Sequence, residues 1–178
     1  MSAVLKFSEI LEIPTLFLLP GVSEPKVPTS VLSKQSARSL SYMVSMAQSH
    51  GIILSVEPHV GSLLSSPKLC LDLLEQVPDL KLTLDYAHFV CMGYVQSEID
   101  LLAEHAAHVH MRQAKPGALQ TKMSEGTLDF IAMVETLRKV NYKGYLSIEY
   151  VHQAYMDTIY DDVLTETILM RDKLRRAI

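Results

Sequence analysis

Four acidic or imidazole side chains each end a short, mainly apolar run, and their types suit metal binding. Glu57 ends "LSVE", Asp85 ends "LTLD", His110 ends "HVH" and Glu149 ends "LSIE". Side chains alternate between the two faces of a strand. In each run the residue two positions earlier is also polar, and the residue between the two is apolar. The pattern predicts four neighbouring strands whose second face carries a small polar residue or histidine, then a potential ligand.

These four side chains are expected to converge, because the carboxyl ends of parallel strands meet at one edge of an α/β fold. A single acid at a strand end is usually a solvated loop residue, but four in matching register are harder to explain in that way. Three carboxylates without a cation would repel one another and lose hydration at high cost. One divalent ion would offset both costs. The oxygen-rich set favours Mn2+, Mg2+ or Co2+, with Zn2+ as a further option.

Apolar runs alternate with amphipathic segments along the whole chain. Glycine and proline positions indicate several boundaries: Thr29 or Ser30 is expected to cap the second helix and Gly51 to end it, while Pro67 suits the first turn of the third. Strands are expected at 13–22, 52–59, 80–89, 108–114 and 143–151, and helices at 2–12, 29–51, 65–77, 95–107, 127–142 (capped near Thr127 or Asp129) and 161–178.

The order α-(βα)5 predicts a parallel sheet covered by helices. Two architectures fit it: an open doubly wound sheet, or part of a (β/α)8 barrel. An open sheet usually carries a glycine-rich phosphate turn after an early strand. The sequence contains no G-x-G-x-x-G, which weakly favours the barrel.

Composition narrows the classes of protein. The 178 residues are 48% hydrophobic and 20% charged, which predicts one folded domain over 1–178 and argues against disorder. A net charge of -4 gives no electrostatic footprint for nucleic acid. Two cysteines, Cys70 and Cys91, make neither a disulfide framework nor a zinc knuckle. No run is long enough for a membrane span and the N-terminus lacks signal-peptide features, so a cytoplasmic location is expected.

Five segments carry a resemblance to a known family: "VEPHVGS", "LTLDYAHF", "HVHMRQA", "SEGTLDF" and "YKGYLSIEY". Together they resemble the xylose isomerase-like TIM-barrel superfamily, and within it the sugar phosphate isomerase/epimerase proteins. The resemblance runs from about Ile10 onwards. It implies a divalent ion held by Glu57, Asp85, His110 and Glu149. It also implies a small-molecule carbohydrate substrate.

The resemblance implies an isomerase or epimerase acting on a small sugar, sugar phosphate or polyol derivative. A divalent ion bound to a hydroxy-ketone acidifies the adjacent C–H and stabilises an enediolate. Glu57 and Glu149 would then remove and return the proton. A glutamate bound to a cation is a weaker base, so a free carboxylate oxygen must carry out the transfer.

Five further residues are candidates for substrate binding. The resemblance implies that His88 points into the pocket near the substrate or the metal's water. Relatives commonly carry an arginine shortly after the strand histidine, and Arg112 or Lys115 can fill that role. Gln113 stands where many relatives have an acid and can bind a sugar hydroxyl, although a glutamine at a strand end is more often only a loop residue. His59 is within reach of the strand ends, with simple surface exposure as the alternative.

The resemblance also indicates that this chain is short. Relatives have eight strands, whereas five are expected here, so the first three strands are expected to be missing. Five strands cannot close a barrel and leave two bare edges. A truncated product, a fragment, or a homo-oligomer that covers the open edges would each fit.

Two other functions remain open. "DYAHFVCMGY" faintly echoes an Asp-x-x-His…Gly-Tyr stretch of endonuclease IV, a metal-dependent phosphodiester hydrolase that shares the barrel. Against that hypothesis stand the acidic chain and the absence of an acid after His110. The remaining alternative is a metal-binding remnant without activity.

Overall fold

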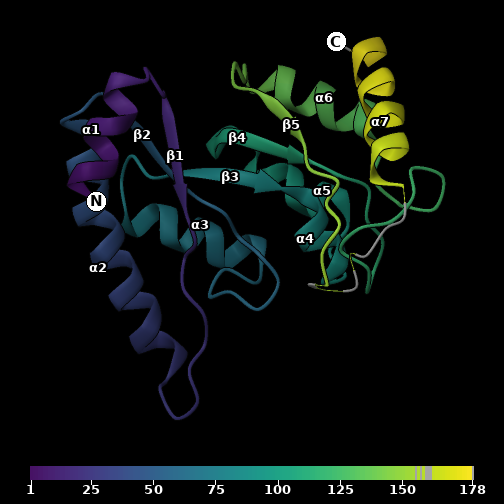
Figure 1. Ribbon diagram of the computed structural model, residues 1–178. Coiled ribbons are helices and arrows are strands. Elements are labelled where there is room, and N and C mark those ends of the chain that lie inside the picture. Colours follow the sequence, from purple (N-terminus) through teal and green to yellow (C-terminus); the bar gives the residue numbers. More distant parts are fainter. Residues whose placement is uncertain (155, 157, 159–161, 178) are drawn as a thin grey trace.

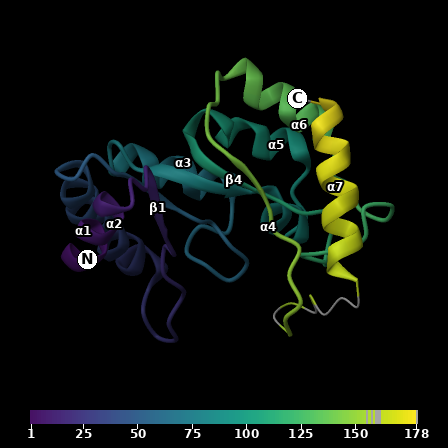
Figure 2. The same cartoon turned by 45° about the horizontal axis from the view of Figure 1, so that its top comes forward.

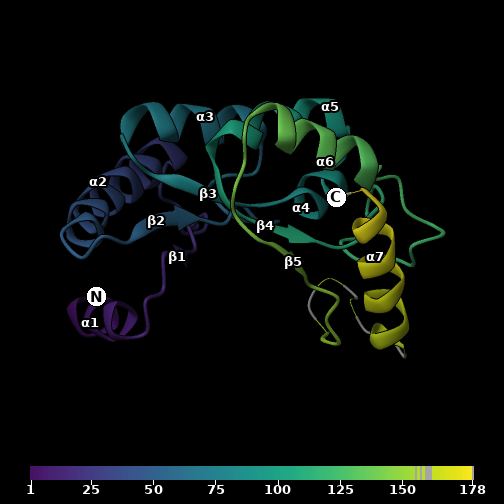
Figure 3. The same cartoon turned by 90° about the horizontal axis from the view of Figure 1, so that it is seen from above.

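Five parallel strands form one sheet in the order β1-β2-β3-β4-β5 (Figure 1). The computed structural model describes residues 1–154, 156, 158 and 162–177. The sheet curls into a half-barrel, with helices along its convex side (Figure 3). The expected incomplete (β/α)8 barrel is therefore confirmed. The strands are β1 Thr15–Leu18, β2 Ile53–Val56, β3 Lys81–Asp85, β4 Ala106–Met111 and β5 Leu146–Ile148.

The helices follow the expected order. α1 and α2 lie at the β1 end of the sheet, and α6 and α7 lie together at the β5 end (Figure 2). The two ends of the helix expected at 161–178 fall outside the described residues. The helices are α1 Ser2–Ile10, α2 Thr29–Gln48, α3 Pro67–Gln76, α4 Tyr86–Cys91, α5 Gln96–Ile99, the 3-10 helix η1 Asp100–His105, α6 Phe130–Lys139 and α7 Val163–Ala177.

Local capping explains where two of these helices begin. α3 starts at Pro67, whose missing N–H costs nothing in a first turn, and the Ser66 hydroxyl accepts an amide hydrogen bond there. The Asp129 carboxylate accepts hydrogen bonds from two amides at the start of α6. The expected cap of α2 was wrong: its N-cap is Pro28, and no side chain caps its amides.

The third strand is shorter than the sequence predicts. β3 ends at Asp85, and the "YAHF" segment that follows it is helical. The Asp85 carboxylate accepts a hydrogen bond from the Ala87 amide at 2.8 Å and so caps α4. Because Asp85 turns the chain from strand into helix, His88 lies one turn into α4 instead of along the strand. All six residues of α4 are buried.

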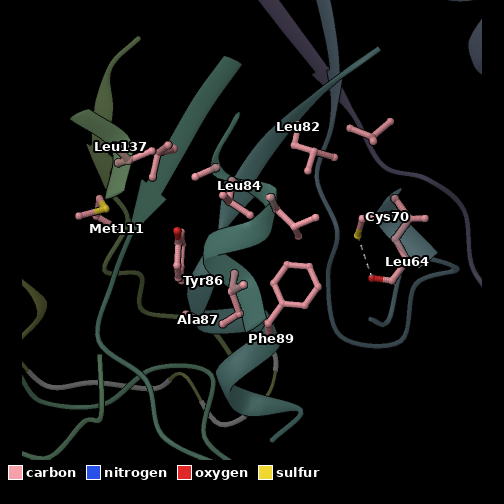
Figure 4. Packing of buried hydrophobic residues seen from close by; sticks show 14 of the residues in the cluster. Leu64, Cys70, Leu82, Leu84, Tyr86, Ala87, Phe89, Met111 and Leu137 are labelled. Atoms are coloured by element: carbon pink, nitrogen blue, oxygen red, sulfur yellow. Dashed lines mark hydrogen bonds between the residues drawn. The ribbon is translucent and has the colours of Figure 1, made fainter. Parts of the chain in front are cut away.

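The apolar face of the sheet packs on the helices. Leu82 and Leu84 of β3 are fully buried, and they share one core cluster with Phe89 of α4, Leu64 and Cys70 (Figure 4). Burial raises the pKa of the Cys70 thiol to about 12. The core thus holds β3 firmly and leaves its other face, with Thr83 and Asp85, toward the inside of the half-barrel.

Both margins of the sheet are open within the described residues, since β1 pairs only with β2 and β5 only with β4. On the β1 side Phe17 and Leu19 are 48% and 60% exposed. None of the described helices has the length and apolar character needed to traverse a lipid bilayer.

Replacing Leu84 with alanine is expected to lower the free energy of unfolding by roughly 2–5 kcal/mol, because a buried leucine leaves a cavity behind. Denaturant unfolding followed by circular dichroism measures the change. Leu101→Ala is the control, since Leu101 is 62% exposed. Equal effects of the two substitutions would contradict the central position of β3.

Candidate metal centre

The strand register brings the four predicted ligands together. Asp85 and His110 are direct neighbours on β3 and β4. The amides of Glu57 and Glu149 each donate to the adjacent strand, to Leu18 O and Met111 O, both at 3.0 Å, so both glutamates still follow the sheet. One ligand atom from each of the four residues lies within 4.8 Å of all the others. That they bind an ion remains a prediction.

His110 stands between the two glutamates. Its Nδ1 lies 2.7 Å from Glu57 Oε1 and 3.2 Å from Glu149 Oε2. Burial alone would lower the pKa of His110, but the nearby charges of Glu149 and Glu57, with the hydrogen bond to Glu57, raise that pKa to about 10. In the metal-free protein His110 is therefore an imidazolium that bridges two carboxylates. A metal bound to Nδ1 would replace this proton, because a ligand histidine is neutral.

Asp85 is paired with a cation that the sequence argument overlooked. Asp85 is fully buried, and its Oδ2 accepts hydrogen bonds from Arg112 Nε at 3.0 Å and Nη2 at 2.6 Å. Burial alone would raise the pKa of Asp85, but Arg112, His88 and the Ala87 amide hold it below its ordinary value. The expectation that only a metal offsets the three carboxylates was thus incomplete, because Arg112 already stabilises one of them.

His88 lies at the inner wall of the site and is 4% exposed. The Val60 amide donates to His88 Nδ1 at 3.2 Å. His88 Nε2 lies 3.2 Å from Arg112 Nη2, which can only donate, and 3.7 Å from Asp85 Oδ2. Burial lowers the pKa of His88, although Asp85 partly opposes the shift. His88 therefore contacts both members of the Arg112–Asp85 pair.

The donor set fits a divalent ion. Glu149 Oε2 is buried and accepts no hydrogen bond within the described part of the chain, although His110 Nδ1 and Arg112 Nη2 lie 3.2 and 3.4 Å away. A buried carboxylate oxygen that accepts no hydrogen bond costs free energy, and direct coordination of a divalent ion would offset that cost. Three carboxylates with one imidazole are ligands that Mn2+, Mg2+ or Co2+ accept.

The cluster borders a cavity of about 300 Å3. His59 Nδ1 lies 2.9 Å from Val60 O, and His59 Nε2 is buried without a hydrogen bond among the described residues. Gln153 was not expected here, and its position in an irregular segment after β5 gives no sequence signal. The lining residues are Leu19, Glu57, His59, His88, Arg112, Glu149 and Gln153.

Gln113 and Lys115, both proposed from sequence as substrate ligands, lie outside that lining. The Gln113 side chain binds the backbone of Leu128, accepting from its amide at 3.0 Å and donating to its carbonyl at 3.1 Å. Lys115 Nζ lies 3.4 Å from Glu125 Oε2. Both side chains therefore organise the loop between β4 and α6.

A polar layer supports the cluster from below. His108 Nε2 lies 2.8 Å from Ser147 Oγ, and Ser55 Oγ lies 2.8 Å from Thr83 Oγ1. Barrel interiors are usually filled by bulky apolar side chains at such positions. The sequence pattern identified these polar residues. It did not identify Phe17, whose ring meets the His110 ring edge-on at 5.9 Å.

A larger cavity of about 550 Å3 lies at the amino ends of the strands. Pro14, His108 and Tyr145 are among its lining residues, and none of the four clustered ligands borders it. The site is therefore assigned by its donor chemistry instead of by cavity size.

Residues 1–168 match the family described as xylose isomerase-like TIM barrel. The chain belongs to this xylose isomerase-like family. A search of curated protein sequences gave no match.

Solved structures show the same fold. The D-allulose 3-epimerase from Methylomonas sp. has a TM-score of 0.74 at 14% identity, and the alignment covers 98% of this chain and 66% of that one. The IOLI protein with a binding zinc atom has a TM-score of 0.77 at 16% identity, covering 99% and 68%. An AP endonuclease of family 2 from Brucella melitensis has a TM-score of 0.69 at 21% identity, covering 84% and 59%. The chain thus spans about two thirds or less of these proteins.

Mn2+ or Co2+ in excess is expected to raise the melting temperature, because an ion that binds only the folded state stabilises it by about 2.7 kcal/mol at 100 times its dissociation constant. Glu149→Gln is expected to abolish the rise. Differential scanning fluorimetry measures both. Glu135→Gln on the exposed face of α6 is the matched control. A full rise in Glu149→Gln would contradict the metal centre.

Proposed function

We propose that the protein is a divalent-metal-dependent isomerase or epimerase that moves a proton next to a carbonyl in a small sugar, sugar phosphate or polyol derivative. One observation carries the proposal. Oxygens of Glu57 and Glu149 lie 2.7 and 3.2 Å from His110 Nδ1, and both glutamates line a cavity. Two carboxylates around one ion binding point suit a reaction in which one group removes a proton and another returns it.

Glu57, Asp85, His110 and Glu149 would hold the ion. When bound there, a divalent ion would polarise the substrate carbonyl and offset the negative charge that develops on its oxygen. The residues of the chain supply the rest of the chemistry. Each glutamate directs one oxygen to the cluster, and in the proposal its second oxygen carries the proton.

The two glutamates differ in access. The Glu149 side chain is 34% exposed and the Glu57 side chain 11%. Glu149 can therefore exchange a proton with solvent, while Glu57 is better shielded. This difference suits a pair of groups that act on opposite faces of one substrate carbon.

Two histidines are suited to orient the substrate. In the proposal, His88, which lines the cavity, hydrogen-bonds a substrate oxygen and helps to place it. His59 Nε2 has no hydrogen-bond partner in the described residues and borders the same cavity. A hydroxyl of a sugar or polyol would satisfy it.

The similar structures support the proposal at the level of fold. A D-allulose 3-epimerase and a zinc-containing IOLI protein share the architecture at 14% and 16% identity. We further infer one domain over residues 1–178. The free, buried thiols of Cys70 and Cys91 suit a reducing, cytoplasmic setting.

A phosphodiester hydrolase is the alternative, and the likeness to a family 2 AP endonuclease favours it. The net charge of -4 opposes binding to a polyanion. The proposal therefore assigns no nucleic-acid or membrane partner. A second copy of the chain over the open β1 and β5 edges fits both functions, as does a metal-binding form without turnover.

The protein loaded with Mn2+ is expected to exchange the C–H proton beside the carbonyl of a ketose with solvent deuterium. A panel of ketoses and ketose phosphates in D2O, followed by proton NMR, measures the exchange. Glu57→Gln and Glu149→Gln are each expected to slow it by about 10²–10⁴-fold, because each removes a proton carrier. Glu135→Gln should leave it unchanged. Cleavage of an abasic duplex without any ketose exchange would instead favour the hydrolase.

A further inference from the structure

Arg112 is held inside the cluster and does not project freely into the cavity. It directly follows Met111, the last residue of β4, and is 3% exposed. Its Nε and Nη2 both donate to Asp85 Oδ2, at 3.0 and 2.6 Å. Nη2 also lies 3.4 Å from Glu149 Oε2. One guanidinium thus contacts two of the four predicted ligands.

This engagement is unlike that of a substrate anchor. An arginine that binds a substrate anion presents its planar fork of donors to the ligand. Here two of the three guanidinium nitrogens, Nε and Nη2, donate to Asp85, a carboxylate that is itself fully buried. Removal of Arg112 would leave the Asp85 charge buried without its partner, which is strongly unfavourable.

The charges of the cluster add up in a simple way. Glu57, Asp85 and Glu149 supply three negative charges, and Arg112 supplies one positive charge. The net charge of these four residues is therefore two negative units. One divalent ion balances it when His110 is a neutral ligand. Without Arg112, the three carboxylates and a bound divalent ion would have a net charge of one negative unit. The bound ion would also no longer be repelled by the guanidinium.

We propose that Arg112 is a positioning residue that balances the charge of the metal centre and limits its affinity for divalent ions, while it orients Asp85 as a ligand. The inference rests on the proposed metal site. Arg112 therefore tunes an ion-binding equilibrium and acts on the reaction only through Asp85. A charge-neutral centre also keeps the bound ion's positive charge available to a substrate oxygen, since fewer surplus carboxylate charges offset it.

The test uses Mn2+ as the probe and compares Arg112→Met with Arg112→Lys. Calorimetric titration at one fixed pH gives the affinity for Mn2+, and thermal unfolding is followed with and without the ion. Arg112→Met is expected to bind Mn2+ about tenfold or more tightly, because a repelling unit charge is lost. Its melting temperature without metal should fall and its rise with Mn2+ should exceed that of the wild type. Arg112→Lys keeps the charge and should stay within about threefold of the wild-type affinity.

Arg38→Met is the matched control, because Arg38 is exposed on α2 away from the cluster. It should behave as the wild type in both measurements. If Arg112→Met does not fold without metal, Arg112→Lys alone decides: an affinity for Mn2+ that departs from that of the wild type by much more than threefold overturns the inference.

Other outcomes separate this inference from the proposed function. Unchanged Mn2+ affinity in Arg112→Met with a raised KM for ketose exchange would make Arg112 a substrate anchor and overturn the inference. Weaker Mn2+ binding would also overturn it, since Arg112 would then only place Asp85. Tighter binding in Arg112→Met, with no exchange by the wild type, would support the inference and remove the isomerase. A wild type that binds no Mn2+ would overturn both.

Discussion

Three carboxylates at one edge of a parallel sheet repel one another, and the geometry of the site follows from how this repulsion is offset. Asp85 is fully buried and keeps its charge through Arg112, which donates to it at 2.6 and 3.0 Å. The His110 ring hydrogen-bonds Glu57 and forms an ion pair with Glu149. The metal-free cluster thus contains two cations of its own. A metal ion that binds His110 would displace the proton of its ring and would lie beside the Arg112 guanidinium.

The fold places these groups through two local devices. Parallel pairing aligns Asp85 with His110 across β3 and β4. Asp85 then caps α4, so the carboxylate that belongs to the cluster also sets the direction of the chain that carries His88. One side chain therefore links strand register, helix start and charge balance. Its backing of fully buried leucines in β3 explains why a polar edge can be held rigidly on a small sheet.

The open half-barrel gives the site its accessibility. The sheet is curled, but β1 and β5 have no outer partners among the described residues. The Glu149 side chain near the β5 margin is 34% exposed, whereas Asp85 at the centre is fully buried. The exposure of the cluster to solvent thus increases from the centre of the sheet toward β5. This chain covers 66% and 68% of two solved structures that share its fold.

The sequence by itself determined the succession of strands and helices and the alternation of faces along each strand, because a period of two depends only on residue order. It predicted, but could not by itself fix, the order of the strands in the sheet that brings the four potential ligands together. Tertiary structure decided the rest. Arg112 lay in a "MRQ" stretch that could equally have faced a substrate, and only the three-dimensional approach of β4 to β3 turned it onto Asp85. Gln113 also follows the end of β4, yet its side-chain amide binds the backbone of Leu128 near the far end of the same loop. Side chains beyond a strand end leave the strand's periodicity, so contacts across the fold determine where they point.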